Sequence, residues 1–289
     1  MAGAGPGARF AFVQFEFAFP LGPADGRYLT RAAPDAEPER VLVLGTTGAA
    51  PRPLIGRRRP RRAEGESAAP EPVPVVRATV IRTDAFDDES AAEQWLDELR
   101  RDADALAAEA AGAAGELNAL LRAHRAAAAD PATRDVAPAG ANAVRVGYGS
   151  GEQVADGRFA AAYELPPGQA TSAAVRRRAS ALAPDERLAA ILGGREDVLA
   201  CEELVLRARA DVDSGRPREA ALQARIALEA LLHELNPQDD ALEADREPIG
   251  RAANAALTTD PPDELNEVVA ACVVRMETAL RRRRIQPSA

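Results

Sequence analysis

The sequence predicts an α+β protein: an N-terminal, mostly antiparallel sheet with a long covering helix, followed by an all-α helical bundle. In the first part of the chain, short runs rich in Val, Ile and Phe alternate with turn residues, a pattern typical of strands. In the second part, apolar residues recur almost throughout at helical spacing. We therefore expect two domains, residues 1–167 and residues 168–289.

The clearest strand is FAFVQFEFAF, residues 10–19. Every second residue from position 13 onward is Val or Phe, whereas Gln14 and Glu16 lie on the opposite face. This alternation predicts a half-buried strand. The turn residues PLGPADG follow, so residues 27–31 are expected to return as the second arm of a hairpin.

Further strands are expected at residues 40–45, 73–83 and 142–149, where short β-branched or apolar runs occur. Residues 158–165 (RFAAAYEL) fit either a strand or a short helix, because their alanines favour a helix and their alternation allows a strand. Residues 49–72 contain five prolines and no apolar period, which predicts a mobile Pro/Arg-rich loop.

The covering helix is expected over residues 89–128, with Asp87 or Asp88 as its N-cap. The region from Gly112 to Gly115 is a candidate break, and the Asp130-Pro131 dipeptide ends the segment. In the second domain, helices are expected at residues 198–215 and 217–235, with further helices running to the basic C-terminal end.

The composition argues against several classes of function. The net charge is −9, which disfavours general affinity for nucleic acids or anionic membranes and leaves only local basic patches for such contacts. No run of apolar residues is long enough to span a membrane, and no leader pattern is present, so a cytoplasmic protein is expected. Cys201 and Cys272 have no metal-ligand spacing and are expected to be buried helix residues.

The segment VRVGYGSG carries three alternating glycines, Gly147, Gly149 and Gly151. Glycine-rich turns cradle phosphates when a strand precedes them and a helix opens behind them. Here the spacing is G-x-G-x-G, no apolar helix is expected at the required point, and the chain has no lysine for a Walker motif. Nucleotide binding through residues 147–151 is therefore kept as a second alternative.

The pattern A-D-G-R-aromatic occurs twice, at residues 24–28 and at residues 155–159. Because Asp-Gly favours turns, the simplest interpretation is two similar hairpin turns in one sheet. A functional interpretation is that Asp25 and Arg27 meet Asp156 and Arg158 at one edge and form a polar binding site.

In residues 197–235 two helical patterns are joined near Gly215, and the second carries Ala220, Ala224, Ala227, Glu229 and Ala230. On these residues the segment resembles the antiparallel helix pair that opens HEPN-type helical domains, and the likeness extends to about residue 284 if later helices complete a bundle. Tetratricopeptide-like helical hairpins are similar. Ribonuclease members of the HEPN group carry an Arg followed, four to six residues later, by a His near a helix end. The corresponding residues here, Arg225 and His233, are separated by one residue too many (IALEALL).

No arrangement of residues in this sequence points to catalysis. With only two histidines a multi-histidine metal site cannot form, and neither histidine accompanies a nucleophile motif. We therefore expect a non-catalytic interaction or scaffold protein without metal or cofactor, which binds a protein partner or itself through the helical bundle. The alternative is a HEPN-like RNA-binding or RNA-cleaving factor that uses Arg225 and His233.

Overall fold

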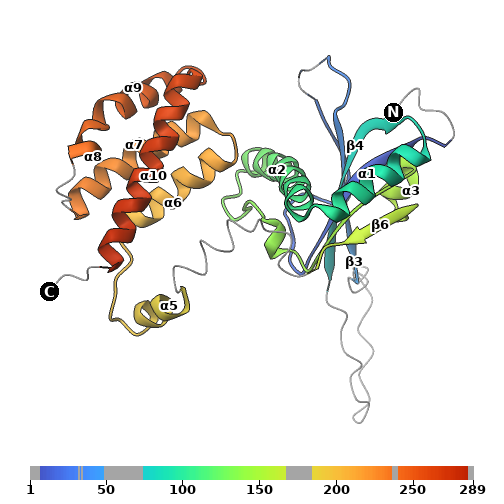
Figure 1. The fold of residues 1–289 in the computed structure, drawn as a ribbon, viewed down its shortest axis with the longest axis horizontal. Coiled ribbons are helices and arrows are strands. Elements are labelled where there is room, and N and C mark those ends of the chain that lie inside the picture. The colour runs from blue at the N-terminus through green and yellow to red at the C-terminus, as the bar shows by residue number, and fades with distance from the viewer. Residues whose placement is uncertain are drawn as a thin grey trace, which may run out of the picture. The chain divides into compact units, whose positions relative to one another are not determined.

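The computed structural model describes residues 7–31, 33, 35–48, 74–166, 184–235 and 240–285. The chain forms two compact units, Met1–Leu182 and Ala183–Ala289 (Figure 1). The first contains a sheet with covering helices, and every element described in the second is a helix, so the fold is α+β. The predicted domain boundary at residue 167 and the predicted loop at residues 49–72 lie outside the described residues.

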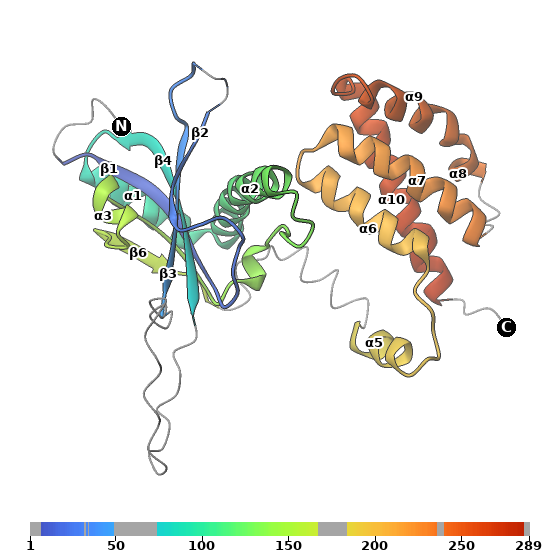
Figure 2. The same ribbon diagram turned by 180° about the vertical axis from the view of Figure 1, so that it is seen from behind.

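The first unit is built on one antiparallel sheet of six strands in the order β2-β3-β4-β1-β5-β6 (Figure 2). The strands are β1 (Arg9–Phe17), β2 (Gly26–Thr30), β3 (Arg40–Thr47), β4 (Val75–Phe86), β5 (Ala143–Gly149) and β6 (Ala161–Glu164). The predicted hairpin of residues 10–19 with residues 27–31 is wrong, because β2 pairs with β3 at the edge of the sheet. The central strand β1 pairs instead with β4 and β5, two strands with long buried apolar stretches.

Strand β1 is buried on both faces, not on one as the alternation predicted. On one face Phe15 and Phe17 pack with residues of two helices, α1 (Glu89–Arg101) and α2 (Ala103–Ala128). On the other face Phe10 and Phe12 pack against Val154 of a short helix, α3 (Gly151–Ala155). The sequence expectation failed because α3 arrives from a distant part of the chain.

The predicted covering helix is two helices, and the break lies at Asp102 and not near Gly112. The backbone of Asp102 is extended, and its side chain accepts hydrogen bonds from the amides of Asp104 and Ala105 at 3.0 Å each. Aspartate is a preferred N-cap, so it starts a new helix here. Gly112 and Gly115 lie inside α2 with open space beside them.

The second unit is a helical bundle whose core is made mainly of Ala, Leu and Val (Figure 1). Its helices are α5 (Pro184–Leu192), α6 (Ala200–Asp213), α7 (Pro217–Leu235), α8 (Asp240–Ala244), α9 (Arg246–Ala256) and α10 (Asp263–Ile285). Small residues such as Ala220, Ala224 and Ala227 on the buried face of α7 let neighbouring helices approach it closely. Over the described part of the chain, none of the helices has the length and apolarity needed to cross a membrane.

Candidate functional site

The glycines of the VRVGYGSG segment are explained by close packing of the chain. Gly147 and Gly149 lie inside β5, and Gly151 is the buried first residue of α3. A Cβ on Gly147 would lie 2.2 Å from the carbonyl oxygen of Ala161, and one on Gly149 would lie 2.8 Å from Val154 Cγ2. The backbone of Ala161 and Ala162 thus fills the space beside Gly147, and the side chain of Val154 fills the space beside Gly149. A short helix does follow, contrary to expectation, but it has only five residues.

The two A-D-G-R segments have different backbones, so the prediction of two similar hairpin turns is wrong. Gly26 is the first residue of β2, and Asp25 accepts hydrogen bonds from the amide and hydroxyl of Thr46 at 2.9 and 2.8 Å. Gly157 instead follows Asp156, the C-cap of α3, with φ of +79°, and its amide donates to the carbonyl of Val154. This is the first position beyond a helix C-cap, at which glycine is favoured.

Of the four polar residues predicted to meet, three do so: Arg27, Asp156 and Arg158. Arg27 Nη1 lies 3.0 Å from Glu152 Oε2, and Arg27 Nη2 lies 3.8 Å from Asp156 Oδ1. Arg158 Nη2 also lies 3.1 Å from Asp156. These side chains are between 47% and 78% exposed, and ion pairs so open to water contribute little. The contact links the edge strand β2 to the end of α3, while Asp25 belongs to a separate contact.

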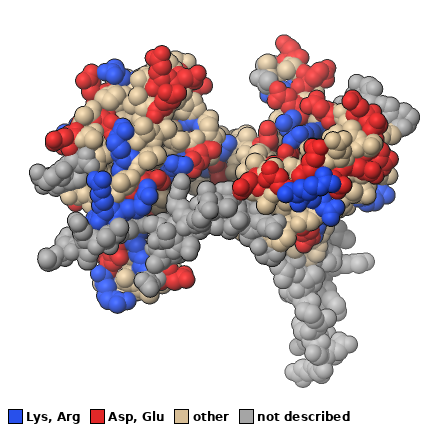
Figure 3. Space-filling model, viewed as in Figure 1, with Lys and Arg blue, Asp and Glu red and all other residues tan. Residues whose placement is uncertain are grey.

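The structure does not bring Arg225 and His233 together on one chain. Arg225 reaches α9, where its Nη1 would lie 3.1 Å from a Cβ on Gly250, whereas His233 is exposed. Glu229, one helical turn from each, pairs with Arg246 at 3.1 Å. On the face seen in Figure 3, acidic and basic side chains are interspersed over the described residues of both units.

A hollow in the sheet unit lies between the segment after β1 and the segment after α2. Its volume is about 560 Å³, within the range of roughly 300–1,000 Å³ that is typical of ligand pockets. We call it the Phe19 groove. It is lined by residues of two ranges, 17–22 and 130–140: Phe17, Phe19, Pro20, Leu21, Gly22, Asp130, Ala132, Thr133, Arg134, Asp135, Val136, Ala137 and Gly140.

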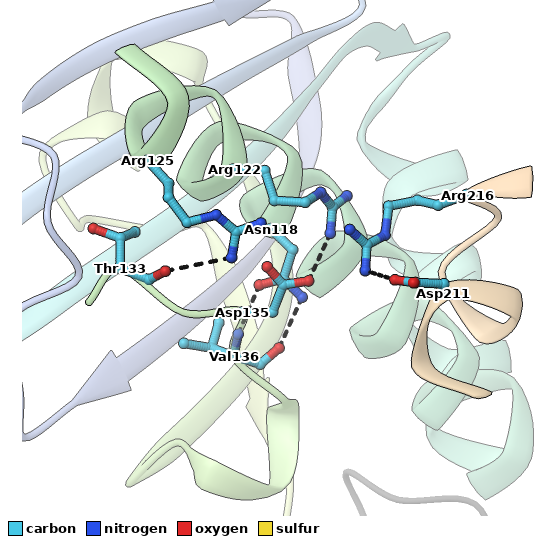
Figure 4. A network of polar contacts seen from close by, with 8 residues as sticks. All are labelled: Asn118, Arg122, Arg125, Thr133, Asp135, Val136, Asp211 and Arg216. Atoms are coloured by element: carbon cyan, nitrogen blue, oxygen red, sulfur yellow. Dashed lines mark hydrogen bonds and ion pairs between the residues drawn. The ribbon is translucent and has the colours of Figure 1, made fainter. Parts of the chain in front are cut away.

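One wall of the Phe19 groove is fastened to α2 by three side chains on one face of that helix (Figure 4). Asn118 donates to the carbonyl of Val136 at 2.9 Å and accepts from the amide of Val136 at 2.7 Å. Arg122 pairs with Asp135 at 2.7 Å, and Arg125 donates to the carbonyl of Thr133 at 3.5 Å. The wall is therefore held in place without a ligand.

Asp130 shapes the start of this wall. Its carboxylate accepts hydrogen bonds from the amide of Ala132 at 2.9 Å and from the hydroxyl of Thr133 at 3.0 Å. These bonds, first of all the one from the Ala132 amide, lower the pKa of Asp130, and the nearby His124 lowers it further. Gly22, with φ of +111°, allows the opposite wall to touch this turn, since a Cβ there would lie 2.8 Å from Thr133 Oγ1.

The chemistry of the Phe19 groove suits binding. Phe19 is 45% exposed, and together with Pro20 it offers an apolar surface beside the polar wall. Asp130 and Asp135 already have donors, whereas Arg134 is exposed and makes no ion pair or hydrogen bond with the described residues. The uncommitted charge of the groove is therefore positive.

The two cysteine thiols of the chain are buried and unreactive. Burial raises the pKa of the Cys201 thiol and of the Cys272 thiol to about 12, so both stay protonated near neutral pH. Among the described residues, no group of three or more His, Cys, Asp or Glu side chains could hold a metal ion. These groups therefore offer no alternative site.

Sequence reasoning missed the Phe19 groove because its two walls are far apart in the chain. The alternation of residues 10–19 places Phe19 in the first strand, and the Asp130-Pro131 dipeptide places Asp130 only at the end of a helix. One local signal was available: DPATRD, residues 130–135, places Asp, Pro and Thr in the order typical of a side-chain-capped turn. That signal predicts a fixed turn, but it does not predict that residues 17–22 lie opposite this turn.

Comparisons with known proteins give no family assignment. No family model matches the chain, and neither a curated protein nor a solved structure matches it significantly.

Proposed function

We propose that this protein is a non-catalytic protein-binding module that receives a partner's apolar side chain in the Phe19 groove. The observation that carries the proposal is an open apolar cavity whose polar wall is already fixed by Asn118, Arg122 and Arg125. A preformed wall lowers the ordering cost of binding. An exposed aromatic at such a wall is typical of an anchor contact.

The charge of the groove defines the partner further. Arg134 has no carboxylate partner among the described residues. A partner segment that carries an Asp or Glu beside its apolar anchor would complement both Phe19 and Arg134. The expected ligand is therefore a short apolar-acidic segment of another protein.

Selection from a random peptide library tests this proposal, with the full-length chain as bait. We expect the enriched peptides to share an aromatic or aliphatic residue next to an acidic one. Phe19→Asp should weaken their binding at least about tenfold, because it places a charge in the apolar wall. Leu29→Asp is the matched control, since Leu29 is an equally open apolar residue of the same unit, 54% exposed, outside the groove.

Two outcomes would contradict the proposal. One is that selection enriches no common peptide. The other is that Leu29→Asp weakens binding as much as Phe19→Asp. Arg134→Glu adds a further check, because it should weaken acidic peptides and spare neutral ones that carry the same anchor.

The RNA and nucleotide alternatives have less support. Glu229 lies between Arg225 and His233 on α7, and residues 159–162 occupy the space beside Gly147 and Gly149.

Self-association through the helical unit and a cytoplasmic location remain predictions of the sequence and part of this proposal.

A further inference from the structure

The polar wall of the Phe19 groove has the backbone of a short strand. Asn118 accepts from the N–H of Val136 at 2.7 Å and donates to its C=O at 2.9 Å (Figure 4). Two residues on neighbouring antiparallel strands exchange the same pair of hydrogen bonds, so the side-chain amide of Asn118 takes the place of a strand residue. The next residue, Ala137, is also extended, with φ of −115° and ψ of 149°. One edge of this short strand is therefore paired with α2.

The opposite edge presents one acceptor and one donor. The described peptide bonds are trans, so the C=O and the N–H of each peptide group point in opposite directions. Both backbone groups of Val136 point to Asn118, and therefore the C=O of Asp135 and the N–H of Ala137 point away from it. Neither of these two groups makes a hydrogen bond with any described residue.

These two groups are accessible from the Phe19 groove. Asp135 and Ala137 are exposed and both line the groove, whereas none of the described residues of α2 does. An acceptor and a donor on either side of one residue are what the edge of a sheet offers to an incoming strand. In the free protein such exposed groups bond to water, and the main chain of a peptide can replace that water at both of them.

We infer that the Phe19 groove binds its partner as an extended segment, which adds a strand to residues 135–137 through the C=O of Asp135 and the N–H of Ala137. In this mode of recognition the main-chain hydrogen bonds give affinity and the side chains give specificity. A helical segment fits less well, because its main-chain groups are bonded within the helix. The inference rests on the proposed function of the groove and adds the conformation in which the partner binds.

The test uses the full-length, ¹⁵N-labelled protein and a blocked tetrapeptide, acetyl-Ala-Phe-Glu-Ala-N-methylamide, and follows binding by NMR and by amide hydrogen exchange. We expect saturable shifts, a downfield shift of the Ala137 amide proton and slower exchange of that proton. The amide of Val136 is the internal control, because Asn118 already bonds it in the free protein.

A series of backbone esters tests the pairing from the side of the ligand. In each member, one N–H of the tetrapeptide is replaced by oxygen, which removes one donor and changes the shape little. One ester should bind about three- to tenfold more weakly, because it leaves the C=O of Asp135 without a donor. Esters at the two neighbouring amides should bind within about twofold of the parent peptide, because alternate amides of an extended chain point the other way.

Ala137→Pro tests the pairing from the side of the protein. It removes a donor that has no partner among the described residues, and it should weaken binding of the tetrapeptide about three- to tenfold. Urea denaturation followed by Trp95 fluorescence checks that the variant folds. The ester series is measured on the wild-type chain, so it decides the question even if this variant does not fold.

Failure of this inference differs from failure of the proposed function. If Phe19→Asp weakens the tetrapeptide but all esters bind equally and Ala137 exchanges as fast as before, the groove binds a partner and the extended mode is wrong. If one ester binds weakly and Ala137 is protected but Phe19→Asp has no effect, the strand pairing holds and the anchor role of Phe19 is wrong.

Two further results would overturn the inference. The first is the absence of saturable shifts in residues 130–137 at tens of millimolar tetrapeptide, where even very weak ligands bind. The second is slow exchange of the Ala137 amide in the free protein, because the occupant would then be a segment of this chain or a second copy and not a partner.

Discussion

The side-chain amide of Asn118 makes two hydrogen bonds with the backbone of Val136, accepting from its N–H at 2.7 Å and donating to its C=O at 2.9 Å. This pairing fixes the wall of the Phe19 groove onto α2 (Figure 4). Asn118 therefore satisfies both the N–H and the C=O of Val136, and neither group needs a water molecule as its hydrogen-bond partner. One side chain thus positions a whole segment.

Asn118→Ala should lower the free energy of unfolding of the sheet unit by about 1–3 kcal/mol, because it leaves both partly buried backbone groups of Val136 unpaired. Urea denaturation followed by the fluorescence of Trp95 measures this change, since the chain has one tryptophan and it packs on the core of this unit. Gln94→Ala is the control and should change stability by less than about 0.5 kcal/mol, because Gln94 is exposed. Equal effects of both variants would contradict the role given to Asn118.

The same substitution should have opposite effects at two glycines of the sheet unit. Gly147→Ala should destabilise the unit by about 1–3 kcal/mol, since its Cβ would collide with the backbone of Ala161 and Ala162. Gly112→Ala should stabilise it by about 0.5–1 kcal/mol, because Gly112 lies inside α2 with open space beside it. Trp95 fluorescence during denaturation compares the two, and a Gly147→Ala variant as stable as the wild type would refute the close approach.

The lowered pKa of Asp130 predicts a pH dependence with a defined sign. A carboxyl group whose pKa is lower in the folded state stabilises the fold above its unfolded pKa, near 4, and this stabilisation is lost as the pH falls through the folded pKa. Asp130→Asn should therefore be less stable than the wild type at pH 6, and the difference should shrink at pH values below about 4. Denaturation curves of both proteins at several pH values test this, and a difference that does not vary with pH would argue against it.

The buried thiols predict slow chemical modification and a loss of stability in alkali. With pKa values of about 12, Cys201 and Cys272 should not react with a thiol reagent at pH 8 until the helical unit unfolds. In the unfolded chain a thiol ionises near pH 8.5, so the contribution of the two thiols to the stability of this unit should be constant below that pH and be lost as the pH rises toward 12. Rapid labelling of either thiol in the native protein would contradict the burial.

Local patterns in the sequence predicted most of the elements but not their partners. The period of two around Phe15 predicted β1, and the β-branched run predicted β4, because such patterns reflect the faces of single strands. The predicted pairing of β2 with β1 was wrong, because β2 pairs with β3. The turn after Phe19 allows the next strand to pair with any antiparallel neighbour, and the surface that each pairing buries decides between them. Two glycines predict a break near Gly112, but the capping side chain of Asp102 starts the second helix instead.

By itself, the sequence determined the α+β class and the helical character of the second half, since both follow from local periodicity and residue chemistry. Only the tertiary structure decided what the individual residues contact. It placed Phe19 opposite the turn at Asp130, it explained Gly147 by the return of β6, and it brought Arg27 to Asp156. The physical reason is that these relationships depend on long-range packing, which joins segments that share no local pattern.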